Sequence, residues 1–394
     1  MRLKDICTVF TDGDWIESKD QSDEGIRLIQ TGNIGEGVYL EKEARAKYIS
    51  EDTFEKLKCT EIYPGDILVS RLPEPVGRAC IVPQKEGRMI TAVDCTICRP
   101  DESIVSKEYL CYFMRSNSYY MKLLGNVTGT TRKRISRKNL ENVKLDVPSK
   151  ENQKEVVKQL DCLSKVIDLR NKELQLFDNL INARFVEMFG DPIQNPKGWD
   201  MSLIEEVVAN EKNALKAGPF GSALKKEYYV TSGYKIYGQE QVISGDCTFG
   251  DYYIDEERYK SLENCAVQAG DVLISLVGTY GKLLIMPEVF EPGIINPRLM
   301  KITFDKEKIN PYYFKFFFQS ESLKRALSEN THGGTMDILN LGIVRKIAMP
   351  LPPLKLQNEF ADFVKQVDKS KVAVQKALDE TQMLFDSLMQ KYFV

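Results

Sequence analysis

Pro64-Gly65-Asp66-Ile67-Leu68-Val69-Ser70 returns in the second half of the chain as Ala269-Gly270-Asp271-Val272-Leu273-Ile274-Ser275. In both copies a Gly-Asp turn precedes a short apolar run, which predicts a buried β-strand. Further on, LDVPSKENQKEV from Leu145 aligns with MPLPPLKLQNEF from Met349, an offset of 204 residues (349 minus 145). A repeat this long exceeds a solenoid unit. We therefore predict two similar halves, a pseudo-two-fold internal repeat.

Composition predicts a soluble protein. The chain has 394 residues, 43% hydrophobic and 28% charged, with a formal net charge of −3. It has no apolar leader and no apolar run of membrane-spanning length, so we expect a cytoplasmic protein without a membrane partner. Nine scattered cysteines are typical of reduced intracellular thiols. A histidine-based metal site or catalytic triad would depend on His332, the one histidine.

Two segments predict long helices. Residues 151–189 contain neither Gly nor Pro, and their apolar residues recur in alternating steps of four and three, as in a heptad seam. A similar stripe, from Phe360 to Tyr392, ends the second half. We expect two helices of about 60 Å that pack together, although each could instead pack only on its own domain. LFDNL at 176–180 matches LFDSL at 384–388 at an offset of 208, so the register between the copies stays open.

The texture of each half predicts an α+β architecture. Short β-type runs separated by Gly and Pro turns precede each long helix, interrupted by one helix near 107–124 and one near 311–327. The sequence therefore predicts a strand-rich domain, a long helix, a linker, a second strand-rich domain and a second long helix. The boundaries that we predict are 1–148, 149–189, 190–200, 201–352 and 353–394.

Catalytic motifs are weak. The segment 278–282 is too short for a phosphate-binding loop. Asn310-Pro311-Tyr312-Tyr313 lacks the second proline expected of an amino-methyltransferase loop, and Cys95-Thr-Ile-Cys98 has no second pair to complete a zinc site. We predict no catalytic residue and no metal site. An atypical nuclease or methyltransferase, or a coiled-coil scaffold that binds protein rather than DNA, remains an alternative.

Local charge favours DNA. Between Arg115 and Lys144 there are eight Lys and Arg against one acid, a net charge of +7. Hydroxyls beside guanidinium groups suit phosphate contacts, although a basic run is often only a solvated face. The corresponding turn of the second half is much less basic, and we predict DNA contacts there at His332 and Thr335. In the basic run, the predicted DNA-contacting residues are Thr130, Arg132, Lys133, Arg134, Arg137 and Lys138.

Short motifs run along nearly the whole chain, each weak alone. They are the two Gly-Asp hairpins, Gly13-Asp-Trp15-Ile-Glu17, Gly25-Ile-Arg27-Leu-Ile-Gln30, Gly32-Asn33-Ile34, Phe189-Gly-Asp-Pro192, Asn195-Pro-Lys-Gly198-Trp199, Gly218-Pro-Phe220-Gly221-Ser222, Gly333-Gly334 and Pro350-Leu-Pro352-Pro353-Leu354 with Gln357. In their order and duplication, these motifs resemble those of the specificity subunits of type I restriction-modification systems. The first half departs from the usual Pro-Leu-Pro-Pro stretch with Val147-Pro148-Ser149-Lys150.

The resemblance implies a non-catalytic subunit with two target recognition domains, each reading one half of a bipartite sequence in double-stranded DNA. It implies that the helices pack as an antiparallel coiled coil, set the gap and dock two methyltransferase subunits. This chain would bind no cofactor; S-adenosylmethionine would belong to the methyltransferase subunits, and ATP and Mg to restriction subunits. Loops of such domains can reach base edges in the major groove. The further DNA contacts that we predict are Arg27, Gln30, Arg71, Arg78, Lys235, Tyr237, Gln239, Gln241 and Lys282.

Overall fold

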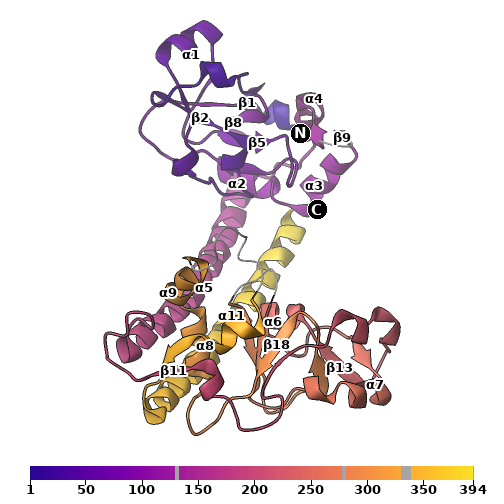
Figure 1. The fold of residues 1–394 in the computed structure, drawn as a ribbon. Helices are drawn as coiled ribbons and strands as arrows, with labels where there is room; N and C mark the ends of the chain where they lie inside the picture. Colours follow the sequence, from indigo (N-terminus) through magenta and orange to yellow (C-terminus); the bar gives the residue numbers. More distant parts are fainter. Residues whose placement is uncertain (129–132, 277–280, 330–338, 394) are drawn as a thin grey trace. The chain divides into compact units, whose positions relative to one another are not determined.

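The computed structural model describes residues 1–128, 133–276, 281–329 and 339–393 (Figure 1). The chain divides into two compact units. Unit 1 comprises Met1–Asn171 and Gln375–Val394, and unit 2 comprises Lys172–Val374. Each unit therefore combines strands with a part of each of two long helices. In the described ranges, no helix is both long and apolar enough to cross a membrane.

Unit 1 contains two four-stranded sheets. The first has the order β1-β8-β5-β6 and is antiparallel throughout. The second has the order β3-β2-β7-β4, in which β2 and β7 run parallel. The central strands are formed by the apolar runs of the sequence, because both faces of these strands are covered. The bounds are β1 Cys7–Asp12, β2 Ile26–Ile29, β3 Tyr48–Ile49, β4 Glu61–Ile62, β5 Ile67–Ser70, β6 Ala79–Ile81, β7 Met89–Thr91 and β8 Cys95–Pro100, with the pair β9 Val127–Thr128 and β10 Arg134–Ile135.

Unit 2 repeats this plan with one strand fewer in its second sheet. The order β12-β18-β15-β16 matches that of the first sheet of unit 1, and the sheet β14-β13-β17 again contains one parallel pair, β13 with β17. A short pair, β11 with β19, joins the two ends of the domain. The bounds are β11 Met201–Leu203, β12 Leu215–Ala217, β13 Tyr234–Tyr237, β14 Tyr253–Ile254, β15 Val272–Ser275, β16 Leu283–Ile285, β17 Gly293–Ile295, β18 Leu299–Ile302 and β19 Ala348–Pro350.

Each single helix predicted inside the domains is in fact two helices. In unit 1 the chain breaks at Ser116, whose side-chain oxygen accepts the backbone N–H of Tyr119 and caps a new helix. The matching break in unit 2 lies at Ser320. The bounds of the shorter helices are α1 Glu51–Leu57, α2 Lys107–Phe113, α3 Asn117–Leu124, α4 Arg137–Glu141, α6 Gln239–Ser244, α7 Glu256–Ser261, α8 Pro311–Gln319, α9 Glu321–Glu329 and α10 Leu341–Arg345.

The two long helices are α5, Lys150–Phe189, and α11, Leu354–Tyr392, each drawn unbroken in Figure 1. They begin alike. The amide of Gln153 donates to the carbonyls of Ile104 and Pro148, and that of Gln357 donates to those of Lys308 and Pro352. All of these residues correspond at the offset of 204, so the helix entry is built in the same way despite the altered proline stretch.

Within unit 1, early residues of α5 contact late residues of α11. The hydroxyl of Tyr392 donates to Gln159, whereas Arg170 donates to Thr381 and to the carbonyl of Ala377. Arg170 and Thr381 each interrupt one of the two heptad stripes with a polar side chain. Their contact pairs these two polar groups with each other.

The ends of the long helices settle the register that the sequence left open. The ring of Phe393 lies 5.2 Å from that of Tyr109, and the ring of Phe185 lies 5.7 Å from that of Tyr313. The tyrosines correspond at an offset of 204, but the phenylalanines correspond at 208 (393 minus 185). The helices therefore align at 204 where they begin and at 208 where they end, which is a four-residue stutter.

Candidate nucleic-acid interface

Two of the predicted arginines of unit 1 are buried. Arg78 is 9% exposed, and its guanidinium donates to the carbonyls of Ile34, Leu72, Pro75 and Thr31. This geometry gives Arg78 a structural role, in which the side chain holds loops of the domain together; the DNA contact at Arg78 stays a prediction from the sequence. In proteins, buried polar groups are paired in this way because an unpaired donor costs about 1–3 kcal/mol.

Arg71 is also buried, at 5% exposure, and its DNA contact likewise stays a prediction from the sequence. Its guanidinium donates to the carbonyl of Val93 at 2.5 Å and lies 3.4 Å from the carboxylate of Asp12. Burial lowers the pKa of Arg71 from its ordinary value. This burial was not predicted, because Arg71 directly follows a predicted strand, at a position where the sequence indicates an exposed turn.

Arg27 and Gln30 lie on and just after β2, and both are half-buried. The guanidinium of Arg27 donates to the carbonyls of Glu41 and Lys47 and lies over the ring of Tyr48. Gln30 follows the last residue of β2, where the backbone leaves the sheet. Of the two, Gln30 lies at the strand end, where loops meet.

The basic run is exposed where the structure describes it. Lys133, Arg134, Arg137 and Lys138 are all exposed, whereas Thr130 and Arg132 lie outside the described residues. Arg134 forms an ion pair of 2.8 Å with Asp94, in the loop that precedes β8. The next residue donates its backbone N–H to the carbonyl of Arg71, so β10 lies beside β5.

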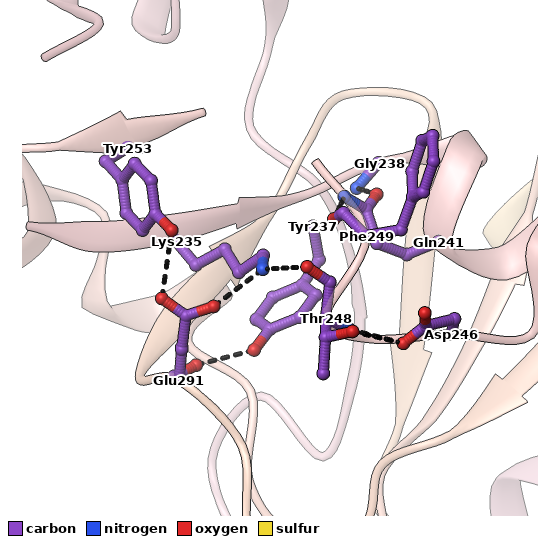
Figure 2. Close-up of polar contacts among 9 residues, drawn as sticks. All are labelled: Lys235, Tyr237, Gly238, Gln241, Asp246, Thr248, Phe249, Tyr253 and Glu291. Carbon is purple, nitrogen blue, oxygen red and sulfur yellow. Dashed lines mark hydrogen bonds and ion pairs between the residues drawn. The ribbon is translucent and has the colours of Figure 1, made fainter. Parts of the chain in front are cut away.

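Three predicted base-reading residues of unit 2 are buried, and Figure 2 shows their polar contacts. The ammonium of Lys235, 1% exposed, bonds to the carboxylate of Glu291 at 2.6 Å and to the carbonyl of Thr248. The hydroxyl of Tyr237 donates to the carbonyl of Glu291. The ion pair with Lys235 also lowers the pKa of Glu291 below its ordinary value. These contacts tie both side chains into the fold, and the DNA contacts of Lys235 and Tyr237 stay predictions from the sequence.

Gln241 is buried as well, and its DNA contact likewise stays a prediction from the sequence. Its carbonyl oxygen accepts the backbone N–H of Gly238 at 2.7 Å, and its amide donates to the carbonyl of Phe249 (Figure 2). Asn33 of unit 1 plays the same part, accepting the backbone N–H of Gln30. The remaining predicted residues of unit 2 divide into Gln239, half-buried, Lys282, exposed, and His332 and Thr335, which lie outside the described residues.

The two units contain the same hydrogen-bonded turn at the carboxyl end of their parallel strand pair. In unit 1 the N–H of Gly13 donates to the carbonyl of Cys95, and the N–H of Arg71 donates to that of Asp94. In unit 2 the corresponding bonds run from Gly218 to Leu299 and from Leu276 to Arg298, each 2.9 Å long, as in unit 1. Position 94 of unit 1 thus corresponds to position 298 of unit 2.

Arg298 is an exposed cation that sequence reasoning missed. Its guanidinium Nη1 lies 3.4 Å from the side-chain oxygen of Gln239, whose amide donates to Ser275 at 2.8 Å. Close to this turn, Trp15 in unit 1 and Phe220 in unit 2 are 69% and 89% exposed. The correspondence between positions 94 and 298 could have been found from the repeat. Because Asp94 and Arg298 have opposite charges, however, it did not indicate a functional site.

The described residues hold no group of three or more His, Cys, Asp or Glu side chains placed to bind a metal ion. Cys95 and Cys98 are buried in β8, and burial raises the pKa of Cys95 to about 12, so its thiol is protonated near neutral pH. These two sulfurs are parts of the core.

The comparisons with known proteins agree with one another. The model of a family described as type I restriction modification DNA specificity domain matches residues 1–176 and 196–381. A putative type I restriction enzyme MjaX specificity subunit of Methanocaldococcus jannaschii is 22% identical over 95% of this chain and 89% of its own length. The MjaVIII specificity subunit of the same organism is 22% identical over 70% of this chain and 68% of its own.

Solved structures are similar in fold. A chain from a study of complex assembly and conformational transition of the type I R-M system has a TM-score of 0.59 and 17% identity, covering 100% of this chain and 96% of its own. The S subunit of a type I restriction-modification system from M. genitalium has a TM-score of 0.57 and 14% identity, covering 100% and 95%.

Proposed function

The chain belongs to the family of type I restriction modification DNA specificity domains, and from this premise we propose how it recognises its target. It is a DNA specificity subunit and has no catalytic role of its own. We propose that it contains two target recognition domains, each reading one half of a bipartite sequence in double-stranded DNA. The observation that carries this proposal is the family match in both halves of the chain.

The proposed domains are residues 1–148 and 201–352, followed by the helices at 149–189 and 353–394, with 190–200 as the linker. The shared sheet order and the matched caps at Gln153 and Gln357 support an internal repeat. The order of contacts in unit 1, Gln159 with Tyr392 and Arg170 with Thr381, supports antiparallel packing of the helices as a coiled coil. In this arrangement the helices act as the spacer between the half-sites.

The DNA contacts that we retain are side chains with exposed polar groups. Lys133, Arg134, Arg137 and Lys138 carry the charge needed to bind phosphates, with Lys282 as a candidate in unit 2. Gln30 and Gln239 lie at strand ends, where side chains can reach base edges. Thr130, Arg132, His332 and Thr335 stay predictions from the sequence alone.

The long helices are the proposed docking surface for methyltransferase subunits. On α5, Leu169, Leu176 and Leu180 are 48–65% exposed and recur at seven and four residues, so they share one face of the helix. On α11, Val372 and Leu384 are also exposed. Exposed apolar stripes are typical of partner surfaces. We propose that two methyltransferase subunits, which use S-adenosylmethionine, bind there, and that restriction subunits with ATP and Mg complete the assembly in the cytoplasm.

The test of this function is a methylation map. The chain is expressed with a methyltransferase subunit in a methylation-free host, and methylated adenines are mapped by sequencing. We expect a bipartite motif with a fixed gap. Matched insertions of seven residues, one heptad, into α5 and α11 should keep both half-sites and change the gap. A continuous motif, or methylation without sequence preference, would contradict the proposal.

The phosphate contacts have a separate test. Arg137→Ala with Lys138→Ala should reduce the slope of log K against log salt by about 1.8, because each lost phosphate contact removes about 0.9. Lys369→Ala with Lys376→Ala on α11 is the control of equal charge. Equal slopes in both double variants would exclude α4 from the interface.

A further inference from the structure

The surface around Arg298 has the properties of a base-reading site. Arg298 is the last residue of the loop between β17 and β18, directly before β18, and β17 runs parallel to β13. Gln239 lies two residues beyond the end of β13. The ends of the two parallel strands thus bring an exposed arginine and a glutamine together. The loops outside the carboxyl ends of parallel strands are common places for ligands.

The backbone of Arg298 is fixed on both sides. Its N–H donates to the side-chain oxygen of Asn296 at 2.9 Å, and its carbonyl accepts the N–H of Leu276. The N–H of Asn296 donates in turn to the carbonyl of Tyr237 at the end of β13. An arginine held in this way loses little freedom when it binds, which favours affinity and geometric selectivity.

The side chain of Arg298 is oriented by a neighbouring residue, but this contact does not use all of its hydrogen-bond donors. One guanidinium nitrogen lies 3.4 Å from Gln239, and Gln239 is itself held by Ser275, which is 1% exposed. No carboxylate of the described residues lies within ion-pair distance of Arg298. Arg78 and Lys235, in contrast, are surrounded by acceptors of their own domains.

An aromatic residue lies on the neighbouring turn. Phe220 is 89% exposed, two residues after Gly218, whose added Cβ would meet the backbone oxygen of Asn296 at 1.9 Å. Only glycine lets the two turns approach so closely. The corresponding turn of unit 1 carries Trp15, also exposed, after a Gly13 that contacts Thr91 in the same way. An exposed aromatic beside this turn in both units supports a contact surface.

We propose that Arg298 is a specificity-determining residue that reads a guanine in the half-site of the second recognition domain, with Gln239 as its positioning residue. The inference rests on the proposed function. A guanidinium presents two parallel donors, which match the O6 and N7 acceptors of guanine in the major groove. Gln239 keeps the fork from rotating freely, and the open side of Arg298 faces the nucleic acid.

The experiment compares methylation motifs of the whole complex. Arg298→Ala should relax one guanine position in one half-site, lowering its discrimination roughly tenfold to hundredfold, while the other half-site is unchanged. Arg298→Lys should relax the same position, since an ammonium lacks the fork. Gln239→Ala should relax it partly, and Gln239→Glu, which keeps an acceptor for the arginine, should preserve it. Arg345→Ala, another exposed arginine of unit 2, is the control.

Three results separate the possibilities. If Arg298→Ala weakens binding to all sequences equally and lowers the salt slope, Arg298 contacts a phosphate and the inference is wrong. If the motif of Arg298→Ala equals that of the wild type, the residue does not touch DNA, and the inference is again wrong. If the wild-type complex itself has no bipartite motif, the proposed function fails first. Thermal unfolding by circular dichroism checks that each variant is folded.

Discussion

The strand-end turns of the two units place a cation at the same point by different means. In unit 2 the arginine belongs to the turn itself, at position 298, and is held by Gln239. In unit 1 the matched position is Asp94, and the cation is Arg134, which arrives from β10 and pairs with that carboxylate. The backbone hydrogen bonds of the turn are the same in both. A fixed scaffold can therefore present different chemistry when side chains change and the backbone does not.

The largest effect should separate Arg78 and Lys282, two cations that correspond at the offset of 204 and directly precede β6 and β16. Arg78→Met would leave four carbonyls of unit 1 without their donor and should cost about 3–5 kcal/mol of unfolding free energy. Lys282→Met, at an exposed position, should change stability by less than about 0.5 kcal/mol. Urea unfolding measures both. Equal losses of unfolding free energy would show that the two cations have the same structural role.

The next effect tests what the turns share. Gly13→Ala and Gly218→Ala should each destabilise the protein by about 1–3 kcal/mol, because the new Cβ would meet a backbone oxygen at 2.3 and 1.9 Å. Gly221→Ala is a matched control, since nothing lies within 4 Å of its Cβ position. Thermal unfolding gives the comparison. If Gly218→Ala were as stable as the control, the inference that the two turns approach closely at Gly218 would be wrong.

A smaller effect concerns the borrowed cation of unit 1. Asp94→Asn removes the charge that holds Arg134, and the pair is partly exposed, so its loss should cost no more than about 1 kcal/mol in stability. Loss of this one contact of Arg134 should weaken DNA binding by less than about fivefold, which corresponds to the same energy. Competition binding on the mapped target measures this. A larger loss for Asp94→Asn than for Arg134→Ala would assign the direct DNA contact to the aspartate.

The smallest effect is a pH dependence that should come from Lys315 in unit 2. Lys315 of α8 corresponds to the buried Cys111 of α2, and burial lowers the pKa of Lys315 below its ordinary value. The charged form is thus disfavoured in the folded state, and this penalty is relieved as pH rises through the lowered pKa toward 10.5. Lys315→Met should remove the penalty, so its stability advantage over the wild type should shrink as the pH rises toward 10.5. An advantage constant with pH would contradict this reasoning.

Sequence patterns predicted the elements better than the contacts. The absence of Gly and Pro over 151–189 was enough to predict α5, and the Gly-Asp turns predicted β5 and β15. The break at Ser116 was missed because one serine carries little signal until its oxygen is seen to cap a helix. The burial of Lys235 was not predicted, because its partner, Glu291, is 56 residues away in the chain. Polar residues on buried strands show their role only when distant acceptors are in place.

The division of α11 between the units has a consequence for protein synthesis. Phe385, Met389 and Phe393 belong to the hydrophobic core of unit 1, yet the ribosome makes them after all of unit 2. Synthesis of unit 1 begins first, but the unit has all of its residues only after the last part of the chain has been made. During translation its core face, including Tyr109 and Phe113, waits for the final turns of α11. A chain that stops after Val374 would therefore lack core residues of its N-terminal half, whereas unit 2 would have all of its own.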